Sequence, residues 1–191
     1  TQSRSSAASD VYKRQSQAQR KVKNVTALGR AGRSLVRLAL ELADSRIVDW
    51  SAERVLLVGT GAYAAVTLAT LRERGAVNIS VYSPSGRAEK FAAKHGIRPV
   101  SAEDYARVAS RSSLLITCTT AAAPVLTPEH LQAPTGIAPE GCPVASHNQM
   151  VVDLGMPRNV DPAVAALEGV ALLDLETCLL YTSDAADDLL C

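Results

Sequence analysis

A glycine pair that directly follows a short apolar run restricts the fold of this chain more than any other feature. The run Arg54–Val58 leads into Gly59-Thr60-Gly61-Ala62-Tyr63-Ala64, and residues at helical spacing follow up to Arg74. In this G-x-G-x-x-A pattern, the first glycine allows a tight turn and the second lets the backbone approach a diphosphate. The free N–H groups at the start of the helix favour the same anion. We predict a dinucleotide site that includes Gly59, Thr60, Gly61, Ala62 and Tyr63. The alternative is a packing turn in a similar domain that binds no ligand.

Strand and helix patterns alternate along the rest of the chain. Further strands are predicted at Val77–Tyr82, Ile97–Val100, Leu114–Cys118, Met150–Leu154 and Val170–Leu173. Helices are predicted at Ser34–Ala43, Ala62–Arg74, Gly86–His95 and Ala102–Ala109 (with Ser101 as N-cap), and short helices open at Thr127 and Asp161. Six apolar strands separated by helices indicate a parallel sheet covered on both faces. We therefore predict an α/β fold of the Rossmann type, doubly wound with strand order 3-2-1-4-5-6, preceded by an N-terminal linking helix.

The end of the second predicted strand indicates which dinucleotide the site prefers. An acid at this position would bind the ribose hydroxyls of NAD, but no acid occurs before Glu89. Ser83, Ser85 and Arg87 stand there instead, and hydroxyls with a guanidinium suit a 2′-phosphate. The pattern favours NADPH over NADH. The alternative for Arg87 is a solvated helix residue.

Small residues follow the fourth predicted strand. Thr119 and Thr120 leave room for the adenosine and ribose part of the cofactor, and we include both in the site. Cys118, immediately before them, is interpreted as a packed strand cysteine and not as a nucleophile, because no His or other base stands near it in the sequence.

The loop after the fifth predicted strand also leaves a carboxyl end, where ligands of such sheets bind. Asp153 is either a site residue or an acceptor that fixes the loop. Gly155 and Pro157 belong to the same candidate site. Arg158 either reaches substrate or cofactor, or caps the loop. No residue pattern in the chain indicates a metal site.

The two ends of the chain resemble translated sequencing-library adapter. Ser5–Gln15 reads SSAASDVYKRQ and Cys178–Asp188 reads CLLYTSDAADD, as one DNA segment and its reverse complement would give. We expect 1–15 and 178–191 to be non-native tails; the alternative is a flexible tail with an acidic C-terminal helix. The remainder has two cysteines, no secretory signal and no apolar run of about 20 residues, so we expect a cytoplasmic protein without a membrane span.

The residues between these ends carry a resemblance to glutamyl-tRNA reductase. It is carried by Gly59-x-Gly61, Ser83–Arg87, Thr117–Leu126 and most specifically by Val152-Asp-Leu-Gly-Met-Pro-Arg-Asn-Val-Asp-Pro162. The resemblance implies an enzyme that reduces glutamyl-tRNA to glutamate-1-semialdehyde with NADPH in tetrapyrrole (porphyrin) biosynthesis. It also implies a thioester-forming Cys in an N-terminal domain and a homodimer formed through a C-terminal helical domain.

This chain departs from the family pattern in extent and in detail. The resemblance divides it into the end of the catalytic domain with a linking helix (16–49) and an NADP-binding domain (50–177). The motif with the nucleophile and the dimer domain are both missing, so no catalytic residue is carried over and we expect the fragment itself to be inactive. Tyr63 and Ala64 replace the usual Met-Gly of the family's glycine loop.

Two other functions remain open. One is a shikimate-dehydrogenase-like NADP oxidoreductase, although no Lys/Asp pair typical of such a site is visible. The other is a nucleotide- or tRNA-binding module, for which the basic residues are Arg20, Lys21, Lys23, Arg30, Arg33 and Arg37. No stacking aromatics accompany this basic patch, so a solvated helix face or linker is its plainer interpretation. The role of the loop Gln132–Asn148 cannot be inferred from its composition.

Overall fold

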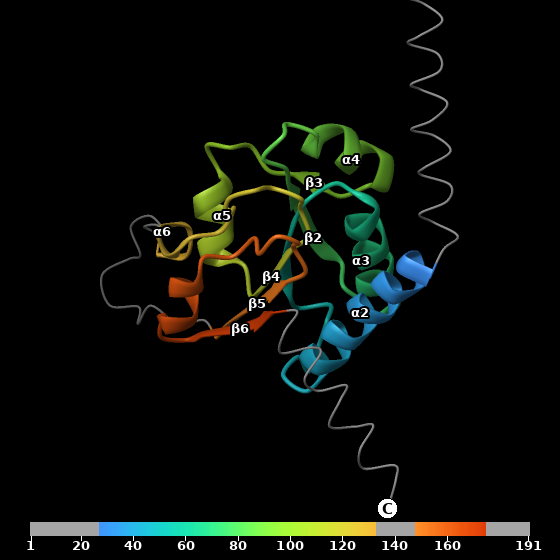
Figure 1. The fold of residues 1–191 in the computed structure, drawn as a ribbon, viewed down its shortest axis with the longest axis horizontal. Helices are drawn as coiled ribbons and strands as arrows, with labels where there is room; N and C mark the ends of the chain where they lie inside the picture. The colour runs from blue at the N-terminus through green and yellow to red at the C-terminus, as the bar shows by residue number, and fades with distance from the viewer. Residues whose placement is uncertain (1–26, 133–147, 175–191) are drawn as a thin grey trace, which may run out of the picture. The chain divides into compact units, whose positions relative to one another are not determined.

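The computed structural model describes residues 27–132 and 148–174, with side chains from residue 35 onward. The chain divides into two units, 1–35 and 36–191, and the sheet belongs wholly to the second. Six parallel strands form one sheet in the order β3-β2-β1-β4-β5-β6 (Figure 1). The strands are β1 (Arg54–Val58), β2 (Asn78–Tyr82), β3 (Arg98–Pro99), β4 (Leu114–Thr117), β5 (Gln149–Asp153) and β6 (Val170–Asp174). The predicted Rossmann-type α/β fold and its strand order are confirmed.

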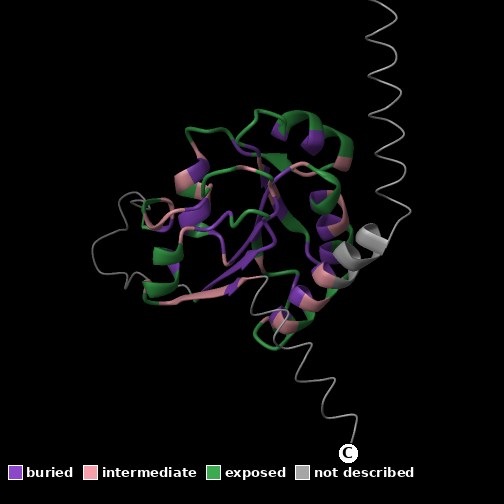
Figure 2. Cartoon of the chain, viewed as in Figure 1, coloured by how far each residue is buried: buried purple, intermediate pink, exposed green. Residues whose placement is uncertain are grey.

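Helices connect the strands and cover both faces of the sheet. They are α2 (Ala27–Asp44), α3 (Ala62–Glu73), α4 (Ala88–His95), α5 (Tyr105–Arg111), α6 (Pro128–Leu131) and the 3₁₀ helix η1 (Pro162–Ala166). In Figure 1, α3 lies on one side of the sheet, and α5, α6 and η1 lie on the other. Every residue of β4 and β5 is buried, because central parallel strands are covered from both sides (Figure 2).

Side-chain alternation along β1 shows how the two faces are filled. Leu56 and Val58 are fully buried in a cluster with Leu115 and Val151 of the neighbouring strands. Tyr105 of α5 packs into the same cluster, which places α5 on this face. The intervening Val55 and Leu57 are also buried and point to the opposite face, since successive side chains of a strand alternate. The apolar run of β1 thus contributes to two cores.

Two helix starts differ from the sequence predictions by three residues or more. The helix predicted from Ser34 begins at Ala27, because the preceding Ala, Leu and Arg residues favour helix despite two glycines. The helix predicted from Ala102 begins only at Tyr105. Here the hydroxyl of Ser101 accepts a hydrogen bond from the backbone N–H of Asp104 (3.1 Å), which closes a turn before the helix starts.

The short helices start as predicted. Thr127 and His130 form a reciprocal capping box around the start of α6. The carboxylate of Asp161 accepts a hydrogen bond from Ala163 N–H at the start of η1 (2.8 Å). Most of the predicted loop Gln132–Asn148 and both adapter-like ends lie outside the described residues. None of the helices in the described part of the chain combines the length and apolarity that a membrane span requires.

Candidate cofactor-binding site

The sheet has its switch point between β1 and β4. These neighbouring strands continue in opposite directions, β1 toward β2 and β4 toward β5, which opens a crevice at their carboxyl ends. A cavity of about 230 Å³ lies there. It is lined by the segments that follow three strands: Gly59, Thr60 and Gly61 after β1; Ser83, Pro84, Ser85 and Arg87 after β2; and Cys118, Thr119, Thr120 and Ala121 after β4.

The glycine turn after β1 uses its two glycines for different purposes. Gly59 has φ +131°, and its N–H donates to the carbonyl of Tyr82 (2.9 Å). A Cβ at Gly59 would lie 2.7 Å from the carbonyl oxygen of Cys118, so no other residue fits there. Gly61 has an ordinary φ of −84° and stands at the N-cap of α3. A Cβ at Gly61 would have no atom within 4 Å, so this glycine keeps open the approach to the uncapped N–H groups of α3.

Three hydroxyls and one guanidinium form a row along the other side of the cavity. The hydroxyl of Thr60 lies 3.5 Å from that of Ser83, which lies 3.1 Å from that of Ser85. Arg87 Nε donates to Ser85 Oγ (2.8 Å). Ser83 is buried, whereas Ser85 and Arg87 are exposed. Among the described residues that line the cavity there is no carboxylate, so the site is suited to an anion.

Cys118 packs directly against Gly59 of the glycine turn. Its thiol is buried and donates to the carbonyl of Val58 (3.4 Å), and its backbone N–H donates to the same carbonyl (2.9 Å). Burial, and secondarily the charge of Asp153, raises the pKa of this thiol to about 12. A protonated, buried thiol is a poor nucleophile, so Cys118 is a packed cysteine, as the sequence indicated.

Asp153 is the acceptor that fixes the loop after β5. Its carboxylate is buried and accepts a hydrogen bond from Thr117 Oγ1 (2.7 Å) on the neighbouring strand. It also accepts from the backbone N–H groups of Gly155 (2.9 Å), Asn159 (2.8 Å) and Val160 (2.9 Å). These four bonds direct the carboxylate into the protein, so of the two alternatives for Asp153 the geometry favours the structural one.

Asn159 joins this loop to the cavity, and the sequence analysis did not single it out. Its side-chain oxygen accepts from Thr119 N–H (2.7 Å), and its amide nitrogen donates to the carbonyl of Pro157 (3.1 Å). Gly155 lies directly against the Asn159 side chain, with no room for a Cβ. In the sequence, Asn159 is visible only as an amide within the Pro-Arg-Asn-Val-Asp-Pro segment. That segment does not indicate which residue the amide would bond.

The predicted site residues therefore fall into three groups. The cavity brings together Gly59, Thr60, Gly61, Ser83, Ser85, Arg87, Thr119 and Thr120. Ala62 and Tyr63 are exposed in the first turn of α3 and do not line it. Asp153, Gly155 and Pro157 form the supporting loop behind it. Arg158 is not among the described lining residues; its guanidinium pairs with Asp174 at the end of β6 (2.8 Å).

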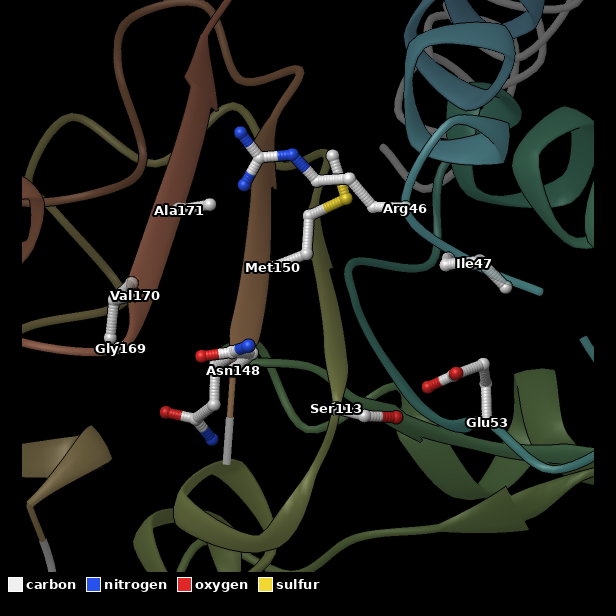
Figure 3. Close-up of a pocket in the computed structure, with 10 residues that line it drawn as sticks. Arg46, Ile47, Glu53, Ser113, Asn148, Met150, Gly169, Val170 and Ala171 are labelled. Atoms are coloured by element: carbon white, nitrogen blue, oxygen red, sulfur yellow. The ribbon is translucent and has the colours of Figure 1, made fainter. Parts of the chain in front are cut away.

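A larger cavity of about 550 Å³ lies at the opposite, amino edge of the sheet (Figure 3). Arg46 and Ile47 enter it from the segment after α2, and Met150 enters from β5. Glu53, before β1, brings the only carboxylate among its lining residues. Its position is a full strand length away from the glycine turn, so it is separate from the candidate cofactor-binding cavity.

Comparison with known proteins gives one family and a consistent group of relatives. The model of the family described as shikimate / quinate 5-dehydrogenase matches residues 41–178. The chain is 52% identical over 171 residues to glutamyl-tRNA reductase of Clavibacter michiganensis subsp. michiganensis. That alignment covers 90% of this chain but 38% of the relative, so the chain spans less than half of the protein it resembles. The resemblance expected from the sequence is thereby confirmed.

Solved structures agree with the fold. Glutamyl-tRNA reductase from Methanopyrus kandleri superposes with a TM-score of 0.65 at 21% identity, over 78% of this chain and 37% of that one. The nucleotide binding domain of glutamyl-tRNA reductase from Thermoplasma volcanium gives a TM-score of 0.55 at 17% identity, over 80% of this chain and 93% of that one. At these identities the superpositions establish the architecture alone.

Proposed function

The chain belongs to the shikimate / quinate 5-dehydrogenase family, and on that premise we propose that it is the NADPH-binding domain of a glutamyl-tRNA reductase. The 52% identity to a reductase of that name supports this choice within the family. The whole enzyme would reduce glutamyl-tRNA to glutamate-1-semialdehyde. Its tRNA contacts, its thioester-forming Cys and its dimer contacts would belong to parts of the protein beyond the NADPH-binding domain.

The cofactor assignment rests on the row of three hydroxyls and one guanidinium that runs from Thr60 to Arg87. Its hydroxyls and guanidinium surround one end of a cavity without a carboxylate. An Asp or Glu there would accept from the ribose hydroxyls of NADH and repel a 2′-phosphate, whereas Arg binds phosphate through charge-assisted hydrogen bonds. We infer that Ser83, Ser85 and Arg87 bind the 2′-phosphate of NADPH.

The rest of the cavity fits the remainder of a dinucleotide. The open space over Gly61 and the free N–H groups at the start of α3 would hold the diphosphate. Thr119 and Thr120 would border the riboses. When bound, NADPH supplies a hydride; the residues of this chain bind and orient the nucleotide. Cys118 takes no part in this, because it is buried and protonated.

The shikimate-type alternative has less support in the structure. A shikimate-dehydrogenase-like site would need a Lys paired with an Asp near the crevice. The lysines in the described part of the chain are Lys90 and Lys94, both exposed on α4 and neither lining the cavity. The basic patch that would serve a tRNA-binding module lies outside the described side chains except for the exposed Arg37.

Titration with NADPH and with NADH tests the proposal. We expect the chain to bind NADPH at least about tenfold more tightly than NADH, which corresponds to about 1.4 kcal/mol. Arg87→Gln should remove most of this preference by weakening NADPH binding while the affinity for NADH stays unchanged. Lys90→Gln, an exposed cation three residues away, is the matched control. Equal affinity for the two nucleotides in the unaltered chain would contradict the proposal.

A further inference from the structure

Four arginines converge on a third cavity, of about 480 Å³, at the amino edge of the sheet. Arg54 is the first residue of β1, Arg98 lies in β3, and Arg107 and Arg111 lie on α5. The other described residues of the lining are uncharged. We refer to this space as the arginine cavity.

Strand register explains why these residues meet although they are far apart in the sequence. Arg54 pairs with Asn78, and Ser80, two residues along β2, pairs with Arg98. Neighbouring residues of parallel strands point to the same face, and so do residues two apart in one strand. All of these side chains therefore share the face on which Tyr82 lies.

Helix α5 covers that same face. Tyr82 stacks on Tyr105 of α5, with ring centroids 3.9 Å apart. Buried Ala109 fixes the orientation of the helix, and Arg107 and Arg111, one turn apart, reach the edge of the sheet. Three separate elements thus bring cations to one cavity.

Two of the four arginines, Arg54 and Arg98, have no ion-pair partner among the described residues. Arg107 pairs with Asp104 (2.6 Å), and this hydrogen bond, with that of Ser101, lowers the pKa of Asp104 so that it stays ionised at neutral pH. Arg54 Nε donates to the backbone carbonyl of Arg111 (2.6 Å), which holds the guanidinium in place without neutralising it. Within the described residues, Arg98 has no carboxylate within ion-pair distance.

We propose that the arginine cavity binds a ligand that carries adjacent phosphate groups. Guanidinium groups match phosphate oxygens in geometry and charge, and several of them around one cavity suit more than one phosphate. The volume is in the range of small-molecule sites. The described residues that line the cavity include no aromatic side chain, so recognition would rest on phosphates and not on stacked bases. A free oligophosphate and the backbone of a nucleic acid present this same chemistry.

This site would be distinct from the dinucleotide site, so it goes beyond the proposed function. The arginine cavity begins at Arg54, whereas the glycine turn follows Val58 at the other end of β1. A five-residue strand spans about 17 Å. Both sites could therefore be occupied at once.

The test titrates the full chain with tripolyphosphate by calorimetry and with a short mixed-sequence RNA duplex by fluorescence anisotropy, both at constant salt. We expect Arg98→Gln/Arg107→Gln to weaken binding of at least one probe by about tenfold or more, because each guanidinium contributes charge-assisted hydrogen bonds. Binding of tripolyphosphate alone would indicate a free oligophosphate, and binding of the duplex alone would indicate a nucleic-acid backbone. The surface pair Arg107–Asp104 contributes little to stability, so the double variant should fold.

Three controls make the outcome decisive. Arg46→Gln removes an exposed arginine of the neighbouring 550 Å³ cavity at the same edge and should leave binding within about twofold. Lys90→Gln, at an exposed cation of α4 that lines neither cavity, should do the same. The double variant should bind NADPH as tightly as the unaltered chain does. Failure of binding at the arginine cavity can then be distinguished from failure of the proposed NADPH binding. The inference is overturned if neither probe binds, or if Arg46→Gln or Lys90→Gln weakens binding as much as the double variant.

Discussion

The side-chain oxygen of Asn159 accepts a hydrogen bond of 2.7 Å from the backbone N–H of Thr119, 40 residues earlier in the chain. Asn159 is itself held by Asp153, which receives its backbone N–H at 2.8 Å. The loop after β4, which borders the candidate cofactor-binding cavity, is therefore held in place from behind by the loop after β5. Neither Asn159 nor Asp153 lines the cavity, yet both determine where Thr119 and Thr120 lie.

Replacing Asn159 should weaken both the fold and the cofactor site. In Asn159→Ala the N–H of Thr119 loses its partner, and an unsatisfied polar group costs about 1–3 kcal/mol. We expect a loss of that size in the free energy of unfolding by urea denaturation, together with weaker NADPH binding. Asn78→Ala, at an exposed asparagine that donates to a surface carbonyl, should change stability by less than about 0.5 kcal/mol. Equal effects of the two substitutions would disprove the role given to Asn159.

The two glycines of the turn should respond differently to alanine. Gly59→Ala places a Cβ against the Cys118 carbonyl at a positive φ, so we expect a loss of more than about 2 kcal/mol in stability or no folding. Gly61→Ala meets no atom and needs no change in φ, so its melting temperature should stay nearly unchanged. Its Cβ would occupy the approach of the diphosphate, and NADPH affinity should fall by about tenfold or more. A Gly61→Ala variant that binds NADPH normally would count against the diphosphate assignment.

Gln149 closes the end of α5 from the first residue of β5. Its buried side-chain nitrogen donates to the carbonyls of Ala109 (3.1 Å), Ser110 (3.1 Å) and Ser112 (2.8 Å). Gln149→Leu leaves these carbonyls without that donor, and we expect a loss of about 2 kcal/mol measured by chemical denaturation. Gln132→Leu, at an exposed residue after α6, is the control and should have little effect. A neutral result at Gln149 would mean that solvent replaces the lost donor.

The thiol of Cys118 should resist alkylation in the folded protein. Its pKa of about 12 keeps it protonated at pH 8, and burial excludes the reagent. With the other three cysteines replaced by serine, iodoacetamide should label Cys118 at least about 100-fold more slowly in the native state than in denaturant, as followed by intact mass. Rapid native labelling at pH 8 would show that the turn above Cys118 opens readily.

The same thiol has a consequence for stability at alkaline pH. Its pKa in the folded state lies above the value of about 9 for a free thiol, so the folded state holds the proton more tightly than the unfolded state does. The contribution of Cys118 to stability is therefore fully present below about pH 9 and is lost as the pH rises toward 12. Cys118→Ala should flatten this part of the stability curve relative to the unaltered chain.

The sequence predicts the sheet well because buried parallel strands read as apolar runs and glycines mark the turns between elements. The order of the strands follows from right-handed crossovers and needs no knowledge of distant contacts. Local sequence patterns do not predict the structure where one side chain can stabilise two different local conformations. Ser101 can cap a helix or close a turn, and the sequence alone does not decide between them.

The site was predictable only in its local part. The glycine turn and the Ser-x-Ser-x-Arg segment are contiguous, so their residues were found. The direction of the Asp153 carboxylate depends on its pairing with Thr117 in the neighbouring strand, which no local pattern shows. The arginine cavity depends on the register of three strands and on the packing of α5. These long-range contacts bring together arginines between positions 54 and 111, and no local sequence pattern predicts them.

The row from Thr60 to Arg87 and the Asp153–Asn159 network lie on opposite sides of the switch point and, in the described residues, share no hydrogen bond. Substitutions after β2 could therefore alter nucleotide selectivity without disturbing the hydrogen bonds of Asp153 and Asn159. Gly155 and Asn159, in contrast, interlock so closely that a change at one demands a change at the other. We expect homologous chains to vary independently after β2 and to vary in concert after β5.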